Sequence, residues 1–165
     1  MKHTLIDKKS LIELIISNLE LELNQAINAA NEAHAAAVDD QSVAETQYDT
    51  LAIEASYLAE GQSRRVQELQ TAIQSYQSLV LIDFNIDKAI ALTATVQLAE
   101  DQQKQHCFFI APAAGGFRCQ QGDQNITVIT PQSPMGLALI GKYQDDDIHV
   151  TLGHNPLIDH IALVQ

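Results

Sequence analysis

The stretch Asp39-Asp40-Gln41-Ser42 separates two long helix-forming segments and contains neither glycine nor proline. Apolar residues recur at steps of three and four before this stretch, and similar steps resume after it. Such spacing is typical of helices that pack against each other along a seam. Because so short a connection cannot join parallel helices, the stretch predicts an antiparallel helical hairpin, a coiled coil with carboxylates at its tip.

The seam of the first helix changes from large to small residues towards this tip. Its positions are Ile12, Ile15, Leu19, Leu23, Ala26, Ala30, Ala33 and Ala37. Those of the second helix are Tyr48, Leu51, Ala55, Leu58, Gln62, Val66, Leu69, Ile73, Tyr76 and Val80. Burial of apolar area stabilises a fold by about 25 cal/mol per Å², and small seam residues bury less of it. We therefore expect the distal hairpin to be slender and to fray first.

Each helix is predicted to begin at a capping box. Ser10 with Glu13, and Ser42 with Glu45, have the Ser-x-x-Glu spacing in which the serine oxygen accepts from a backbone amide and the glutamate reaches back. Gly61 lies inside the second helix, where glycine costs about 1 kcal/mol relative to alanine. Both a bend and a break in the helix are compatible with a glycine at this position.

The pattern changes after residue 82, where all seven glycines but one and all four prolines occur. Short alternating apolar runs, typical of strands, are separated there by turn signals. The runs are 92–99, 107–110, 126–129, 148–152 and 161–164. Ser133-Pro134 predicts one short apolar helix with a serine cap and a proline at its first position, ended by Gly141.

These patterns together predict an α+β protein. A helical hairpin occupies 1–82 with its acidic tip at 39–42, a linker occupies 83–90, and a C-terminal domain occupies 91–165. The C-terminal domain is expected to be a mostly antiparallel sheet with one short helix. The two cysteines, Cys107 and Cys119, are too few for a disulfide scaffold, and each is expected in a strand as a small hydrophobe.

The formal net charge of −12 limits the classes of partner. Free binding to nucleic acid needs a Lys/Arg surface that displaces counterions, so we expect no direct sequence-specific nucleic-acid binding. A basic surface on a protein is the more natural target. The N-terminal segment shows neither a secretory pattern nor a membrane span, which predicts a cytoplasmic protein without a membrane partner.

The C-terminal half carries a resemblance to a known family. Ser133-Pro134-Met135-Gly136-Leu137-Ala138-Leu139-Ile140-Gly141-Lys142 is followed by Asp146-Asp147-Ile148-His149-Val150. With the preceding hairpin and linker, this order closely resembles the Gre transcription elongation factors, GreA and GreB. Ala44-Glu45-Thr46-Gln47-Tyr48, just past the tip, continues the resemblance, which covers nearly the whole chain.

The resemblance implies a fold, a partner and a set of site residues. The C-terminal domain would be FKBP-like and dock at the rim of the secondary channel of a bacterial-type RNA polymerase, with Ser133, Pro134 and Met135 in contact. The hairpin would enter the channel, and Asp39 and Asp40 would help to hold a Mg²⁺ ion in the polymerase active centre. The tip residues are Asp39, Asp40, Ser42 and Glu45. The chain would be an accessory factor and not an enzyme, with no cofactor of its own beyond Mg²⁺ shared with the polymerase.

The tip departs from the family pattern. Cleavage-competent Gre factors resemble Asp-x-x-Glu-Asn-Ala-Glu-Tyr, and anchoring that pattern on Tyr48 places Gln41 and Ala44 at its Asp and Glu. No other register supplies both carboxylates. Arg64 and Arg65 are the only basic residues between 10 and 80. The tip slightly favours a regulator that occupies the channel and modulates elongation or pausing, while stimulated cleavage of backtracked RNA stays open.

Plainer interpretations stand beside these. Asp39 and Asp40 are ordinary turn residues, and Pro134 starts a helix wherever it follows a cap. A coiled-coil adaptor or chaperone-like protein with an FKBP-like domain is the alternative from another class. Its enzymatic version, a prolyl isomerase, needs an aromatic-lined pocket that four phenylalanines and no tryptophan supply poorly.

Overall fold

The computed structural model describes residues 5–41, 48–101 and 105–165, and of residues 37–41, 48–52 and 55 it describes the backbone alone. The chain forms two compact units. Ile16–Gln74 makes up one, here called the hairpin unit, and Met1–Ile15 with Ser75–Gln165 makes up the other, the sheet unit. The start of the first helix and the end of the second therefore belong to the sheet unit. The domain boundaries expected at 82 and 90 stay predictions.

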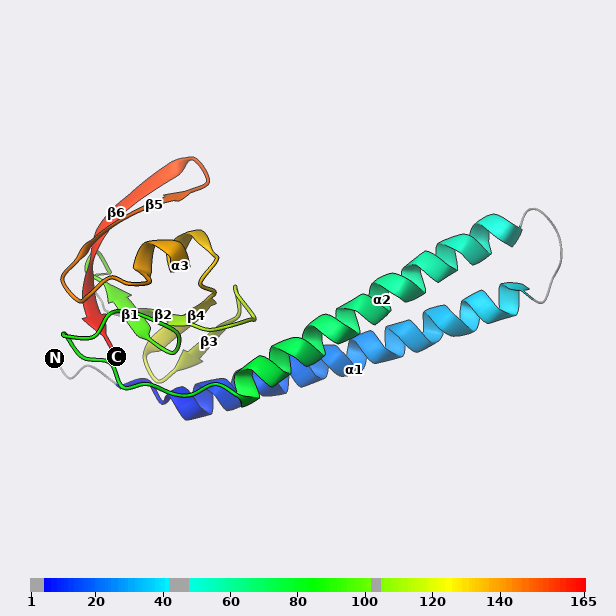
Figure 1. Ribbon diagram of the computed structural model, residues 1–165, viewed down its shortest axis with the longest axis horizontal. Coiled ribbons are helices and arrows are strands. Elements are labelled where there is room, and N and C mark those ends of the chain that lie inside the picture. Colours follow the sequence, from blue (N-terminus) through cyan, green and yellow to red (C-terminus); the bar gives the residue numbers. More distant parts are fainter. Residues whose placement is uncertain (1–4, 42–47, 102–104) are drawn as a thin grey trace. The chain divides into compact units, whose positions relative to one another are not determined.

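Two long helices, α1 (Lys8–Gln41) and α2 (Tyr48–Gln77), form the hairpin that the seam pattern predicts (Figure 1). Because no glycine or proline interrupts it, α1 continues through Gln41. Asp39 and Asp40 therefore occupy the last turn of a helix, which corrects the turn expected to start at 39. Residues 42–47, which include Ser42 and Glu45 of the second capping box, lie outside the described residues.

Asp7 caps α1, and the expected cap at Ser10 is wrong. The Asp7 carboxylate accepts from the backbone amides of Lys9 at 3.1 Å and Ser10 at 3.2 Å. It also accepts from the Ser10 hydroxyl at 2.7 Å. Aspartate satisfies the free amides of a first turn as well as serine does, so the helix begins at the earlier of two competent caps.

The buried positions of the helices follow most of the expected seam. They include Ile15, Leu19, Ala26, Ala30 and Ala33 of α1, and Ala59, Leu69, Ile73 and Tyr76 of α2. Leu58 is exposed while its neighbour Ala59 is 2% exposed, so the seam of α2 is shifted by one residue there. Val80 lies beyond the end of α2 and is exposed. α2 passes through Gly61 without a break.

Six strands form one sheet in the order β3-β4-β2-β1-β6-β5. They are β1 (Thr95–Leu98), β2 (His106–Ile110), β3 (Arg118–Gln121), β4 (Gln124–Ile129), β5 (Asp147–Leu152) and β6 (Asn155–Val164). β2 and β4 are parallel, and the other neighbouring pairs are antiparallel. The predicted combination of a helical hairpin with a mostly antiparallel sheet is thus confirmed.

The sheet has more strand than the apolar runs predict. β3 was not expected, because its sequence is Arg-Cys-Gln-Gln. β6 begins at Asn155 and not at 161, because its first part pairs along the whole of β5. Cys107 and Cys119 both lie in strands as expected, and burial raises the pKa of the Cys107 thiol to about 12.

The expected short helix is α3 (Pro134–Leu139), with Ser133 as its cap and Pro134 at its start. Gly141 follows it with a positive φ of 81°, a conformation that glycine adopts without strain. Met135 and Leu139 pack into the core of the sheet unit with Ile110, Ile129 and other buried residues. Within the described residues, no helix combines the length and apolarity that a membrane span requires.

Candidate functional site

The residues expected to contact a partner, 133–135, divide into internal and exposed positions. The Ser133 hydroxyl accepts from the Gly136 amide at 3.0 Å and donates to the Thr130 carbonyl at 2.7 Å. Met135 is buried in the core. Only Pro134 is exposed. Ser133 and Met135 therefore shape this segment, while Pro134 can touch a partner.

Gly136 permits the tight turn that brings α3 against the preceding loop. It is buried, and a Cβ atom built on it would overlap the carbonyl oxygen of Thr130 and crowd Pro131. That same Thr130 carbonyl accepts from the Ser133 hydroxyl and from its amide. A side chain at 136 would therefore displace the loop that supports the cap.

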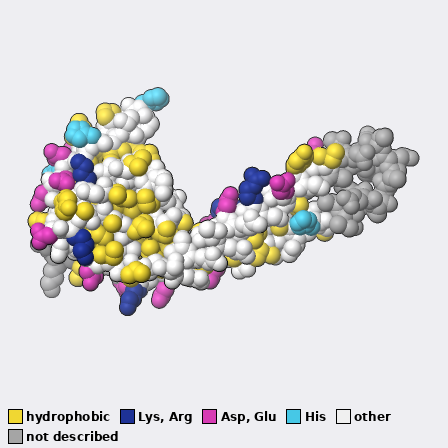
Figure 2. Space-filling model, viewed as in Figure 1, with side chains coloured by type: hydrophobic (Ala, Val, Ile, Leu, Met, Phe, Trp, Pro, Cys, Tyr) yellow, Lys and Arg dark blue, Asp and Glu magenta, His cyan; other side chains and the backbone are white. Residues whose placement is uncertain are grey.

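Sequence reasoning missed the exposed apolar residues that follow Pro134. Leu137 is 71% exposed, and Ile140 and Tyr143 are also exposed. Pro134, Leu137 and Ile140 are three residues apart, and residues at this spacing are neighbours on a helix surface. That spacing was the signal available in the sequence. We call Pro134, Leu137, Ile140 and Tyr143 the α3 surface. Figure 2 shows hydrophobic side chains gathered on the viewed face of the sheet unit.

Charged and polar groups border the α3 surface on its C-terminal side. Asp146 accepts from the Tyr143 amide at 2.8 Å, which fixes the turn after α3. Lys142, Asp145 and Asp147 are exposed around the same turn. An apolar centre with a polar border is the composition typical of protein interfaces.

The hairpin unit uses its two arginines in ion pairs. Arg65 lies 2.8 Å from Glu22 of α1 and 3.6 Å from Glu68, and Arg64 lies 3.5 Å from Glu60. All of these side chains are largely exposed, so each pair contributes little to stability. Both arginines of this unit are thus paired with glutamates, and the remaining charged side chains of the unit are acidic.

The two residues expected to hold Mg²⁺, Asp39 and Asp40, lie near the C-terminal end of α1. Asp39 and Asp40 are consecutive residues of α1, and consecutive helical positions lie about 100° apart around the axis. Only the backbone of these two residues is described, so the Mg²⁺ role expected for their carboxylates stays a prediction. Among the residues whose side chains the structure describes, no group of three or more His, Cys, Asp or Glu gathers as a metal site.

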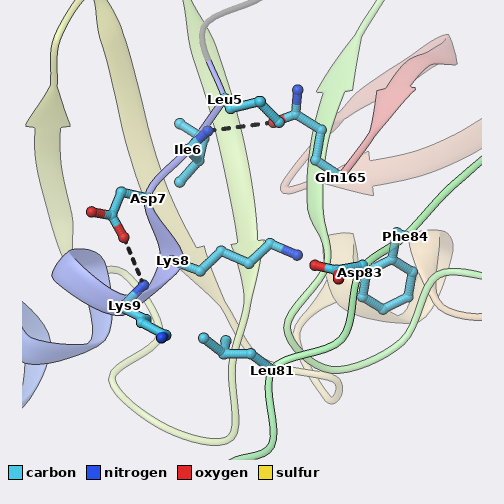
Figure 3. Close-up of a pocket in the computed structure, with 9 residues that line it drawn as sticks. All are labelled: Leu5, Ile6, Asp7, Lys8, Lys9, Leu81, Asp83, Phe84 and Gln165. Atoms are coloured by element: carbon cyan, nitrogen blue, oxygen red, sulfur yellow. Dashed lines mark hydrogen bonds between the residues drawn. The ribbon is translucent and has the colours of Figure 1, made fainter.

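A pocket of about 480 Å³ lies in the sheet unit beside the start of α1 (Figure 3). Lys8 extends into it, donates to the Ile82 carbonyl at 3.0 Å and lies 5.1 Å from the centre of the Phe84 ring. Burial lowers the pKa of Lys8, and the nearby Asp83 carboxylate opposes that shift. These contacts make Lys8 an anchor for the segment after α2. The described lining of this pocket contains one aromatic residue, Phe84.

No protein-family profile matches the chain, and no curated protein matches it. Its fold resembles solved structures of the transcription factor Gfh1. One, described as the structure of the transcription factor Gfh1, is 15% identical, covers 90% of this chain and 92% of its own, and has a TM-score of 0.39.

Two further solved structures of similar fold are Gfh1 proteins from Thermus species. GreA factor homolog 1 (Gfh1) of Thermus thermophilus is 15% identical over 91% of this chain and 94% of its own, with a TM-score of 0.36. Gfh1 of Thermus aquaticus is 16% identical over 90% and 92%, with a TM-score of 0.37. At these identities the likeness concerns the fold alone.

Proposed function

We propose that this chain is an accessory transcription factor that binds a bacterial-type RNA polymerase at its secondary channel. The α3 surface contacts the channel rim, and the hairpin enters the channel. The observation that carries the proposal is α3 itself. The segment in which the chain most resembles the Gre family, 133–142, forms a capped helix that exposes Pro134 and Leu137 and buries Met135.

The dimensions of the hairpin support the second part of the proposal. α1 has 34 residues, which at about 1.5 Å each make a helix of roughly 50 Å. Its distal seam consists of Ala26, Ala30 and Ala33, which keep the pair of helices narrow. A long, narrow and acidic element suits insertion between basic walls.

The mechanism that the tip supports is occupation of the channel without cleavage. Gln41 stands where the family pattern has an aspartate, and Asp39 and Asp40 follow each other on a helix. A shared Mg²⁺ ion needs carboxylate oxygens, and the two positions that carry them in the family pattern are Gln41 and Ala44 here, which supply none. The inserted hairpin would then act by obstruction, slowing nucleotide addition or prolonging pauses.

Leu137→Asp tests the docking surface. The side chain is 71% exposed, so the charge should disturb the interface and leave the fold intact. We expect polymerase capture in a pull-down to fall about tenfold or more, because burying an unpaired carboxylate at an apolar contact is costly. Val80→Asp is the matched control, since Val80 is 76% exposed outside the α3 surface. Equal capture by both variants would exclude α3 as the contact.

A stalled-complex assay separates the two mechanisms. We expect the protein to slow RNA extension without shortening the transcript. Asp39→Ala combined with Asp40→Ala should preserve this obstruction. Mg²⁺-dependent shortening of the RNA, abolished by the double variant, would instead establish a cleavage stimulator.

A further inference from the structure

One face of the sheet changes from apolar to polar with distance from α3. Ile110 of β2 and Ile129 of β4 are buried in the core that includes α3. At the other end of these strands, the same face carries His106 and Asn125. Packing of the core does not require polar residues at this end of the strands. His106 and Asn125 therefore need an explanation other than core packing.

The strand register places five polar side chains on this face. In the pairing of β3 with β4, Arg118 is opposite Thr127 and Gln120 is opposite Asn125. In the pairing of β2 with β4, His106 is opposite Asn125. Because side chains alternate along a strand and opposite residues share a face, all five point to the same side.

These five residues line a pocket of about 420 Å³. That volume lies within the range of small-molecule sites, roughly 300–1,000 Å³. Cys119 and Ile126 also border the pocket, but they alternate to the opposite face and contribute backbone. His106 Nε2 and Thr127 Oγ1 are hydrogen-bonded at 2.9 Å, which holds both side chains in place.

Arg118 gives the pocket its charge. It is exposed and forms no ion pair with any residue in the described part of the chain, although acids outnumber basic residues 21 to 9. Burial lowers the pKa of His106, Asp101 opposes that shift, and the nearby Arg118 guanidinium adds to it. The Asp101 carboxylate is engaged by the His106 amide.

We propose that this pocket binds the phosphate group of a small ligand the size of a nucleotide. The planar guanidinium of Arg118 matches two phosphate oxygens. The amides of Gln120 and Asn125 and the hydroxyl of Thr127 add donors around it. The pocket volume of about 420 Å³ is larger than a phosphate ion and leaves room for a group attached to it. The acidic chain as a whole repels a long polyanion, which favours a ligand with few phosphates over a nucleic-acid strand.

Titration of the full-length protein with inorganic phosphate and, separately, with AMP tests this site. Backbone amide NMR signals of residues 118–120 and 125–127 should shift and saturate. Arg118→Gln should weaken binding about tenfold or more, the effect expected for a lost hydrogen bond to a charged group. Arg64→Gln, which removes the same charge from an exposed position on α2, should bind like the original protein.

The outcomes separate the sources of the phosphate. Tighter binding of AMP identifies a nucleotide, and equal affinities identify the phosphate group alone; both support the site. The spectra of the variants report at the same time whether they fold. If neither probe gives saturable shifts, or if both arginine variants lose affinity equally, the proposal is wrong. The test needs no polymerase, so its outcome is independent of the proposed function.

Discussion

Single residues explain how α3 is presented. Ser133, Pro134 and Gly141 were recognisable in the sequence because each has a local role at a helix end. Met135 was expected at a contact but lies in the core, since its direction depends on tertiary packing that no local pattern encodes. Leu137 was missed although its spacing from Pro134 and Ile140 places the three on one side of the helix, because the spacing alone does not say whether that side faces the core or the solvent.

Gly136→Ala should destabilise the protein. A methyl group there would overlap the Thr130 carbonyl oxygen, a backbone atom that cannot move without disturbing the loop. We expect a loss of about 1–3 kcal/mol in the free energy of unfolding, the usual range for overpacking. Urea denaturation measures it. An unchanged midpoint would show that the loop adjusts without cost.

Gly61→Ala adds the same methyl group but should stabilise the protein. Position 61 is inside α2, and a Cβ atom there would meet no neighbour within 4 Å. Alanine favours a helix over glycine by about 1 kcal/mol, so the urea midpoint should rise. A fall in the midpoint would mean that the glycine serves a conformation other than the continuous helix.

At the scale of elements, hydrophobic periodicity predicted the two long helices well and the strands partly. The helices were recognisable because the three/four spacing continues over many turns. β3 was missed because its residues are exposed or half-buried and carry no apolar face. Its existence depends on pairing with β4, which is not a local property. The start of α1 was misplaced because two good caps compete within four residues.

The Asp7 cap of α1 should make the stability of the protein depend on pH. Hydrogen bonds from Ser10 lower the pKa of Asp7 below its ordinary value of 3.8. A carboxyl with a depressed folded-state pKa stabilises the fold above its unfolded-state pKa, and this contribution disappears as the pH falls through the folded-state pKa. Asp7→Ala should therefore destabilise the protein at pH 7 and have less effect at about pH 3.

Asp7→Asn is the control for that measurement. Asparagine caps helices about as well as aspartate but does not titrate in this range. Its stability relative to Asp7→Ala should stay constant between the two pH values, as followed by urea denaturation. If Asp7→Ala loses the same stability at both pH values, the carboxylate is not the working cap.

For the whole molecule, the sequence predicted which structural elements are combined better than it predicted where the functional sites lie. The helical hairpin and the mostly antiparallel sheet with one short helix are present as expected (Figure 1). The acidic stretch at 39–42 was the starting point for the function, yet its first residues continue α1. The pocket around Arg118 had no sequence signature, because its residues come from three strands that only the sheet brings together.

The central claim, that this chain occupies the secondary channel of RNA polymerase, is tested most directly by competition with a Gre factor. A fluorescently labelled Gre factor bound to polymerase should be displaced as this protein is added, and Leu137→Asp should displace it poorly. Formation of a complex that holds both proteins at once, or no displacement by the folded protein at any concentration, would contradict the claim.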